Sequence, residues 1–172
     1  MNERPRPSSG AAADPARVSI SVVSHGQARL VASLLADVAA HVRTPIEVIL
    51  TLNLPEVLPF DPARFAFPLR IVENAAPKGF AANQNAAFRA SRGGFFCVLN
   101  PDIRIERDPF PELLKCFLDP AVGVAAPLIR NPAGSIEDSA RRFPTPLSIL
   151  RKAFLRRSSL EYSVEDAPAH PE

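Results

Sequence analysis

The chain has 172 residues, of which 47% are hydrophobic, and it carries a formal net charge of +2. This length and apolar content suffice for one domain with a buried core, and they exclude a largely disordered chain. The nearly balanced charge argues against a nucleic-acid partner, and no apolar run approaches the ~18 residues needed to cross a bilayer.

The first 17 residues are polar and rich in Pro, Ser and Ala. They lack the apolar middle region of a secretory signal, so we expect a disordered leader over residues 1–17. Two cysteines, Cys97 and Cys116, are too few for a disulfide framework or a cysteine metal site. We therefore expect both to be small buried residues in a reducing compartment.

Strand and helix patterns alternate along the chain from residue 18. The predicted strands are 18–23, 46–50, 69–72, 95–99 and 122–126, and the predicted helices are 27–42, 79–91, 110–118 and 146–157. Residues 53–68 are rich in proline and should be mostly loop, and residues 131–134 predict a hairpin turn. The alternation predicts an α/β fold with a mostly parallel, twisted sheet flanked by helices.

We expect one domain over residues 18–157, followed by a flexible tail over 158–172. No Gly-x-Gly-x-x-Gly motif follows the first predicted strand, and the phosphate-loop motif is also absent from the sequence. Their absence argues against a simple dinucleotide-binding or phosphate-loop enzyme.

The segment 95–99 is a run of five apolar residues and predicts a central strand buried on both faces. Pro101 cannot donate to a sheet ladder, so the strand should end near Asn100, with Asp102 just past its carboxyl end. Open α/β sheets bind ligands along that edge, and a carboxylate there is suited to hold a divalent metal against a phosphate. The competing interpretation is a plain Asn-Pro-Asp turn.

Residues 74–85 form a second informative segment, in which Gly79 permits close backbone approach and a helix starts directly afterwards. Free N–H groups at a helix start favour an anion, and Lys78 adds a positive charge. Asn83 and Asn85 fall in the early turns, where Ala or Leu would form a better helix. The segment predicts a cradle for a nucleotide diphosphate, and the competing interpretation is an ordinary loop before a helix packed through small residues.

Together these segments resemble the family 2 glycosyltransferases, which are inverting enzymes with the Rossmann-like, nucleotide-sugar-binding glycosyltransferase A-type fold. The resemblance covers residues 18–152 and is closest to rhamnosyltransferase-like members that build cell-surface polysaccharides. Its motifs are the strand and tip at 18–24, Asn74 with Lys78-Gly79-Phe80 and Asn83-x-Asn85, the Leu-Asn-Pro-Asp-like segment 98–102, and the stretches 127–134 and 139–145. Each motif is weak alone, but four in the family's order and spacing make a specific match.

The resemblance implies transfer of a sugar from a nucleotide diphosphate donor to a saccharide or lipid-linked acceptor. Asp102 would bind Mg²⁺ or Mn²⁺, and Asn100 takes the first position of the usual Asp-x-Asp motif. The candidate donor-binding residues are Ser24, Asn53, Asn74, Lys78, Gly79, Asn83, Asn85, Asn100 and Arg141. The competing interpretation of Arg141 is a solvated basic side chain.

One position departs from the family pattern. Leu52 stands where many relatives carry an acidic residue that contacts the base or ribose of the donor. Asn53, Ser24 or His25 would then have to replace that contact.

The family's general base is an acidic residue in a second half rich in Asp, Glu and aromatic residues. Here the acidic pair Glu165-Asp166 is followed directly by Ala167-Pro168, so we expect a solvated tail. We therefore expect a C-terminally incomplete donor half, to which a second copy or another protein would supply the rest. The alternative is a non-catalytic nucleotide-sugar-binding or assembly module. A nucleotidyltransferase ranks last, because its Gly-rich basic loop is absent after the first strand.

The segment 147–157 is basic and amphipathic. We expect it to pack as a helix on the sheet or on the missing half. The competing interpretation is a helix that rests on the anionic inner face of the cell membrane, near a lipid-linked acceptor. The resemblance and composition together predict a cytoplasmic protein, at most peripheral to that membrane.

Overall fold

The computed structural model describes residues 14–131 and 133–136 of the chain. The chain divides into two units, one that ends at Pro120 and one that begins at Ala121. The described elements of the first unit are β1 (Asp14–Ser24), α1 (Ala28–His41), β2 (Ile46–Leu52), the short 3₁₀ helix η1 (Pro62–Arg64), β3 (Leu69–Glu73), α2 (Phe80–Ala90), β4 (Gly93–Val98) and α3 (Phe110–Cys116). The first four predicted strands and the first three predicted helices are thus confirmed to within a few residues.

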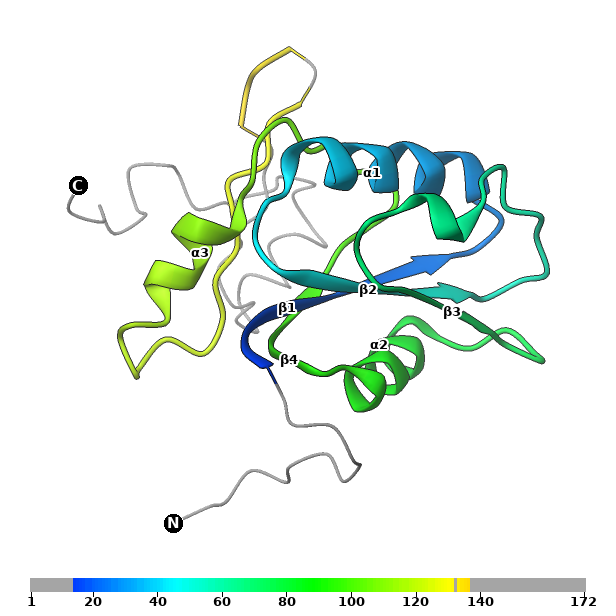
Figure 1. The fold of residues 1–172 in the computed structure, drawn as a ribbon, viewed down its shortest axis with the longest axis horizontal. Helices are drawn as coiled ribbons and strands as arrows, with labels where there is room; N and C mark the ends of the chain where they lie inside the picture. Colours follow the sequence, from blue (N-terminus) through cyan, green and yellow to red (C-terminus); the bar gives the residue numbers. More distant parts are fainter. Residues whose placement is uncertain (1–13, 132, 137–172) are drawn as a thin grey trace, which may run out of the picture. The chain divides into compact units, whose positions relative to one another are not determined.

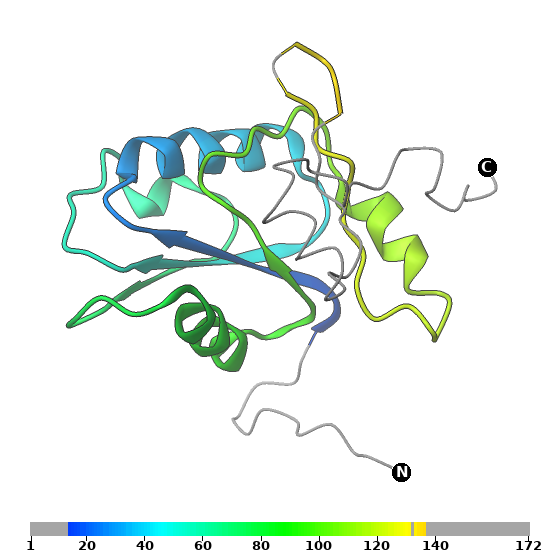
Figure 2. The ribbon, with the colours of Figure 1, turned by 180° about the vertical axis from the view of Figure 1, so that it is seen from behind.

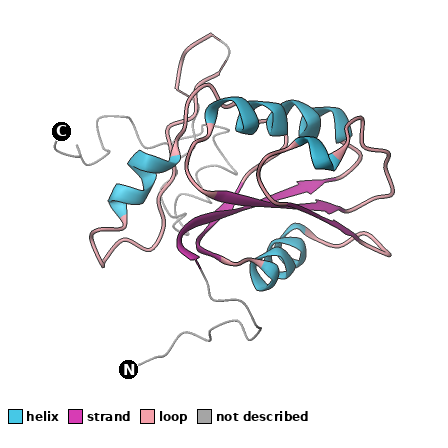
Figure 3. Ribbon diagram, in the orientation of Figure 1, coloured by secondary structure: helices cyan, strands magenta, loops and turns pink. Residues whose placement is uncertain are grey.

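The four strands form one parallel sheet in the order β3-β2-β1-β4. Helix α1 covers one face and α2 the other, and Figure 2 shows the same layers from behind (Figures 1, 2 and 3). Because the strands are parallel, all their carboxyl ends lie at one edge of the sheet. The strand order reverses on the two sides of β1, and such a point is where open α/β sheets bind ligands.

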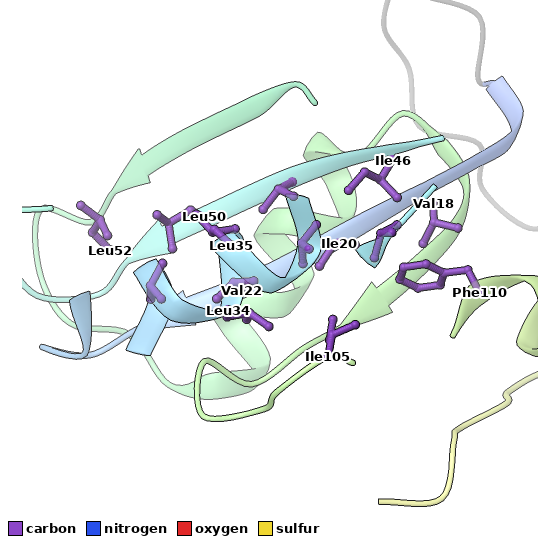
Figure 4. Packing of buried hydrophobic residues seen from close by; sticks show 14 residues of the cluster. Val18, Ile20, Val22, Leu34, Leu35, Ile46, Leu50, Leu52, Ile105 and Phe110 are labelled. Carbon is purple, nitrogen blue, oxygen red and sulfur yellow. The ribbon is translucent and has the colours of Figure 1, made fainter. Parts of the chain in front are cut away.

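The face beneath α1 carries the apolar core (Figure 4). Alternate residues of β1, namely Val18, Ile20 and Val22, lie in this core because side chains alternate between the two faces of a strand. They pack with Leu34 and Leu35 of α1, and all five are at most 2% exposed. Burial of each such side chain contributes about 1.5–3 kcal/mol, so this face supplies most of the apolar stabilisation.

The face beneath α2 is more polar. The hydroxyl of Ser19 donates to Glu47 Oε1 at 2.6 Å, and it accepts from the backbone N–H of Gly93 at 2.8 Å. The same Glu47 oxygen accepts from the backbone N–H of Arg92 at 2.6 Å. These bonds hold the start of β4 against β1 and β2, at the edge of the sheet opposite the strands' carboxyl ends.

Two predictions about this sheet were wrong. β1 begins at Asp14, whose N–H donates to Arg92 O at 3.1 Å, so residues 14–17 belong to the fold and not to the expected leader. β4 is an edge strand of the described sheet, and Val98 is 47% exposed, so it is neither central nor buried on both faces. A short apolar run indicates a strand, but its neighbours in the sheet decide its burial.

Cys97 lies in β4 and Cys116 at the end of α3, and both are free thiols. Each is partly buried, whereas the sequence predicted buried residues. Burial nevertheless raises the pKa of the Cys97 thiol to about 11, so it stays protonated at neutral pH.

The second unit has no helix or strand ladder in its described residues, 121–131 and 133–136. The predicted strand 122–126 is therefore wrong, and Val124 is 87% exposed. An apolar run forms a strand only where another strand completes its ladder, and none of the described residues does so here. The predicted turn is confirmed, since Gly134 N–H donates to Asn131 O at 2.8 Å and one antiparallel bridge joins Arg130 to Ile136.

Several predictions lie outside the described residues. They are the leader up to residue 13, the helix 146–157, the tail 158–172, the acidic pair Glu165-Asp166 and the site residue Arg141. Within the described part of the chain, no helix combines the length and the apolar character needed to cross a membrane.

Two carboxylates tie loops to the rest of the first unit. Asp37 of α1 accepts two bonds from the Arg104 guanidinium, at 2.6 and 3.0 Å, and a third from Ile105 N–H at 3.2 Å. Asp108 accepts from the N–H groups of Arg43 and Thr44, both at 2.8 Å. Its other oxygen accepts from the N–H of the first α3 residue at 3.0 Å, so one of the N–H groups at the start of that helix has a partner.

Acid should weaken this fold through Asp37 and Asp108. The bonds from Arg104 hold the pKa of Asp37 below its usual value of 3.8. Burial alone would raise the pKa of Asp108, but its hydrogen bonds outweigh that effect and lower it. A carboxyl group whose pKa is lower in the folded state than in the unfolded state stabilises the fold when it is ionised. This stabilisation is complete above the pKa of the unfolded state, about 3.9, and it is lost as the pH falls through the pKa of the folded state.

We therefore expect the free energy of unfolding, measured by urea titration, to be level near neutral pH and to fall below about pH 4. The double variant Asp37→Asn, Asp108→Asn should have a lower free energy of unfolding at neutral pH. That free energy should also fall by less than in the wild type when the pH is lowered. An equally steep fall in the double variant would assign the acid sensitivity to other groups.

Candidate functional site

A pocket of about 400 Å³ opens at the carboxyl edge of the sheet. It is lined by residues that follow each of the four strands, among them His25, Asn53, Lys78, Gln84, Asn100 and Asp102. The volume falls in the range of small-molecule sites, and most of the residues that line the pocket have polar or charged side chains. All of these residues belong to the first unit.

Three asparagines form a hydrogen-bonded group beside the pocket, here called the asparagine cluster (Asn53, Asn74 and Asn83). Asn53 Oδ1 accepts from Asn74 Nδ2 at 2.9 Å and from Asn83 Nδ2 at 3.0 Å. Asn74 Nδ2 also donates to Asn83 Oδ1 at 2.8 Å. The cluster joins the ends of β2 and β3 to the first turn of α2.

Asn53 also holds the peptide backbone of Lys78. Its Oδ1 accepts from the Lys78 N–H at 2.8 Å, and its Nδ2 donates to the Lys78 carbonyl oxygen at 3.0 Å. Asn83 Nδ2 donates to the same carbonyl at 3.2 Å. The loop after β3 is thereby held in place, and the exposed Lys78 side chain forms no ion pair with any described residue.

Helix α2 begins at the pocket. Gly79 is its N-cap, with φ of −67°, and no side chain caps the helix, so the N–H groups of the first turn are available to a ligand. A Cβ at Gly79 would meet nothing within 4 Å. The packing and backbone conformation of the protein itself therefore do not require glycine at this position.

Asp102 lies in a tight turn after β4. The Ile103 N–H donates to Asn100 O at 3.3 Å, with Pro101 buried at the second turn position and Asp102 exposed at the third. The Asp37–Arg104 ion pair, 2.6 Å at its shortest, anchors the chain directly beyond this turn. Asp102 is thus held at the rim of the pocket that Lys78 also lines.

The other predicted site residues are placed as follows. Ser24 is fully buried, and its hydroxyl accepts from the Gln27 N–H at 3.1 Å, so it supports the turn after β1. Asn85 is exposed on α2 and is not among the residues that line the pocket. Leu52 is 3% exposed and lies in the apolar core, and it is not among the residues that line the pocket.

The donor atoms at the rim fit a divalent cation only in part. Within residues 14–131 and 133–136, no three His, Cys, Asp or Glu side chains lie close enough to hold a metal by themselves. The pocket offers the Asp102 carboxylate and the Asn100 amide oxygen. That set fits Mg²⁺ or Mn²⁺ if phosphate oxygens and water complete the coordination, as Mg²⁺ commonly allows.

Sequence reasoning missed two features of the site. Gln84 lines the pocket at 8% exposure, and its Oε1 has no hydrogen-bond partner. The sequence feature that could have predicted this role is a glutamine on the sheet-facing side of a short alanine-rich helix. The Asp37–Arg104 pair joins residues 67 positions apart in sequence, and nothing local predicts it.

Residues 19–166 match the sequence profile of the family described as Glycosyl transferase family 2, and this match spans most of the chain. The chain belongs to glycosyl transferase family 2. No protein with a curated description matches this family 2 chain.

The family 2 chain is similar in fold to the crystal structure of S. aureus TarS, with a TM-score of 0.51 and 16% sequence identity. The similarity covers 64% of this chain and 23% of the TarS chain. The parallel sheet flanked by helices is therefore the glycosyltransferase A-type fold that the sequence predicted. The matched part of this chain corresponds to less than a quarter of the length of the TarS chain.

Proposed function

We propose that the pocket binds the diphosphate of a nucleotide sugar and that the chain acts in glycosyl transfer to a saccharide or lipid-linked acceptor. One observation carries the proposal: a carboxylate, an ammonium and an uncapped helix start line the same pocket. Membership of family 2, whose enzymes commonly use a divalent metal, supports it. The rhamnosyltransferase-like subtype is part of the proposal and rests on the sequence motifs.

Two features would bind the diphosphate itself. The first-turn N–H groups of α2 carry partial positive charge and point their hydrogens at a ligand. Lys78 adds a full positive charge beside them, on a backbone that the asparagine cluster holds. The leaving nucleotide diphosphate of a transfer reaction would be stabilised by these same groups.

Asp102 would hold Mg²⁺ or Mn²⁺, with Asn100 as a second oxygen ligand. When bound, the ion supplies Lewis-acid neutralisation of charge on the phosphate oxygens. The turn at Pro101 and the Asp37–Arg104 pair fix the backbone that presents Asp102. Asp102 can therefore meet the ion without a large rearrangement of its loop.

A second candidate is donor binding without transfer. An inverting transferase needs a general base for the acceptor hydroxyl. Among the described residues that line the pocket, Asp102 is the single carboxylate, and the proposal assigns it to the metal. The base would then come from another part of the protein or from another chain.

The test is titration calorimetry of the full chain with UDP, GDP and thymidine diphosphate, with and without Mg²⁺ or Mn²⁺. We expect one of these nucleotides to bind more tightly when metal is present. Asp102→Ala should weaken the metal-dependent binding by about tenfold or more, as for loss of a charged contact. Glu112→Gln on α3 is the matched control and should bind as the wild type does. If metal increases the nucleotide affinity of Asp102→Ala as much as that of the wild type, the proposed role of Asp102 is wrong.

A donor sugar is then offered with candidate acceptors, and released nucleotide diphosphate is measured. Product that contains the transferred sugar supports the enzyme, whereas binding without release or transfer supports the second candidate.

A further inference from the structure

Strand β4 is an edge of the sheet without the features that usually keep sheet edges from pairing. In the part of the chain that the structure describes, β1 pairs with its inner side and no strand pairs with its outer side. Its sequence, Gly93–Val98, contains neither a charged residue nor a proline. The other edge strand, β3, exposes Arg70 and Glu73, and charges of this kind discourage the addition of a strand. Of the two edges, β4 is therefore the one that is open to a further strand.

The backbone groups of β4 that face outward follow from its bonds to β1. The Leu99 N–H donates to Ser21 O at 3.0 Å, so the odd-numbered residues of this segment direct their N–H and C=O groups toward β1. Gly94, Phe96 and Val98 then direct theirs away from β1. None of the described strands takes up these outward groups, so they are available to another strand.

The side chains beside this edge are apolar and partly exposed. Phe96 lies on the face that α2 covers, because its ring contacts Phe88 of α2 with 5.3 Å between the ring centroids. Val98 lies on the same face, two residues further along the strand, and is 47% exposed, while Phe88 is 53% exposed. Gly94 is exposed on this face too and has no side chain. The edge thus combines unpaired backbone with apolar side chains and a gap at Gly94.

A second copy of β4 fits this edge when it runs antiparallel about a two-fold axis at Phe96. This register sets Gly94 of each copy opposite Val98 of the other, and it is the one register that pairs all three outward-facing residues. Directly opposite residues of an antiparallel pair have their side chains on the same face. Val98 of the second copy would therefore fill the gap at Gly94, diagonal to Phe96.

We propose that two copies of this chain associate through β4, as antiparallel strands centred on Phe96, so that the sheet continues from one copy into the other. The lack of charge favours a second copy in particular, because two identical strands bring like charges together and β4 has none to repel. The association does not depend on the proposed function, since none of Gly94, Phe96 and Val98 lines the pocket.

The mass of the full chain in solution tests the association. In sedimentation velocity, the 18.6 kDa chain should show twice that mass at about 100 μM and should dissociate on dilution. Val98→Lys places an unpaired charge in the interface and should weaken the association by about tenfold or more. Val57→Lys is the matched control and should associate as the wild type does, since Val57 is 90% exposed in the loop after β2.

Circular dichroism spectra that match the wild type confirm that both variants fold. A monomeric wild type would overturn the proposal and leave the edge to another segment or to a different protein. Equal association of Val98→Lys and Val57→Lys would overturn it as well, because the contact would then lie away from β4.

A disulfide tests the register. Gly94→Cys and Val98→Cys in one chain lie four residues apart, about 13 Å along a strand, which is too far for a disulfide within the chain. Across the proposed axis the same two positions are opposite each other, with about 5.5 Å between their Cα atoms, and Gly94 has no positive φ that would resist a side chain. Mild oxidation of the double variant should therefore give a covalent dimer on a denaturing gel without reductant.

The wild type, which carries Cys97 and Cys116, and the two single variants are the controls for this gel and should remain monomers on it. A double variant that has the mass of a dimer in solution but forms no covalent dimer would overturn the antiparallel pairing centred on Phe96.

Discussion

Replacement of Asn53 by alanine should lower the free energy of unfolding by roughly 3–5 kcal/mol. Asn53 is 5% exposed, and its Oδ1 accepts three N–H groups. Alanine would remove these three hydrogen bonds and the one from Asn53 Nδ2 to the Lys78 carbonyl, and each hydrogen bond contributes about 0.5–1.5 kcal/mol. The same loss should release the loop that carries Lys78, so nucleotide binding should fall with stability. Urea unfolding followed by circular dichroism measures the effect.

Asn85→Ala is the matched control, because it removes an exposed amide from the same segment. We expect the unfolding free energy to change by less than about 0.5 kcal/mol, since alanine also forms a better helix than asparagine. Equal stability of Asn53→Ala and Asn85→Ala would show that the asparagine cluster contributes little to the fold.

The second large effect is expected at Gly93, the first residue of β4. A Cβ there would lie 2.5 Å from Arg17 O and 2.9 Å from Ser19 N, both of them backbone atoms of β1. Backbone cannot rotate away as a side-chain tip does, so β4 would have to move and the Gly93 bond to the Ser19 hydroxyl would be strained. We expect Gly93→Ala to lose about 2–4 kcal/mol of unfolding free energy, measured in the same urea titration.

Gly79→Ala provides the contrast, since a Cβ at that position meets nothing within 4 Å and φ is ordinary. The variant should fold as stably as the wild type. If this variant is stable but binds nucleotide diphosphate less tightly, the added methyl group hinders binding of the ligand and does not disturb the fold. A Gly93→Ala variant as stable as Gly79→Ala would contradict the close approach of β4 to β1.

Local patterns were sufficient to predict most of the fold. β-branched runs predicted β1 and β2, and the alternation of apolar and small polar residues along β1 matches its two different faces. The end of β4 before Pro101 followed from the missing proline N–H, because proline cannot extend a ladder. Parallel strands then bring all the strand ends to one edge, which is why Asp102 and Lys78 could be predicted to lie near each other.

What the sequence could not predict depends on contacts between distant segments. The exposure of Val98 follows from the place of β4 at the edge of the described sheet, and an apolar pattern does not encode strand order. The run 122–126 has strand composition but no ladder partner among the described residues. The amides of Asn74 and Asn83 were predicted to contact a ligand, and that stays a prediction, with Asn83 among the residues that line the pocket. Their hydrogen bonds to Asn53, which lies more than 20 residues away in sequence, could not be predicted from local patterns.

Asn53 recognises residue 78 through its peptide group and makes no use of the lysine side chain. The path of the loop therefore does not depend on the charge of the side chain at position 78. The loop could keep its path with arginine, glutamine or glutamate at position 78. One substitution there would therefore change the charge at the rim of the pocket without a change in the fold. Divergence in ligand preference within such a fold would then require no new architecture.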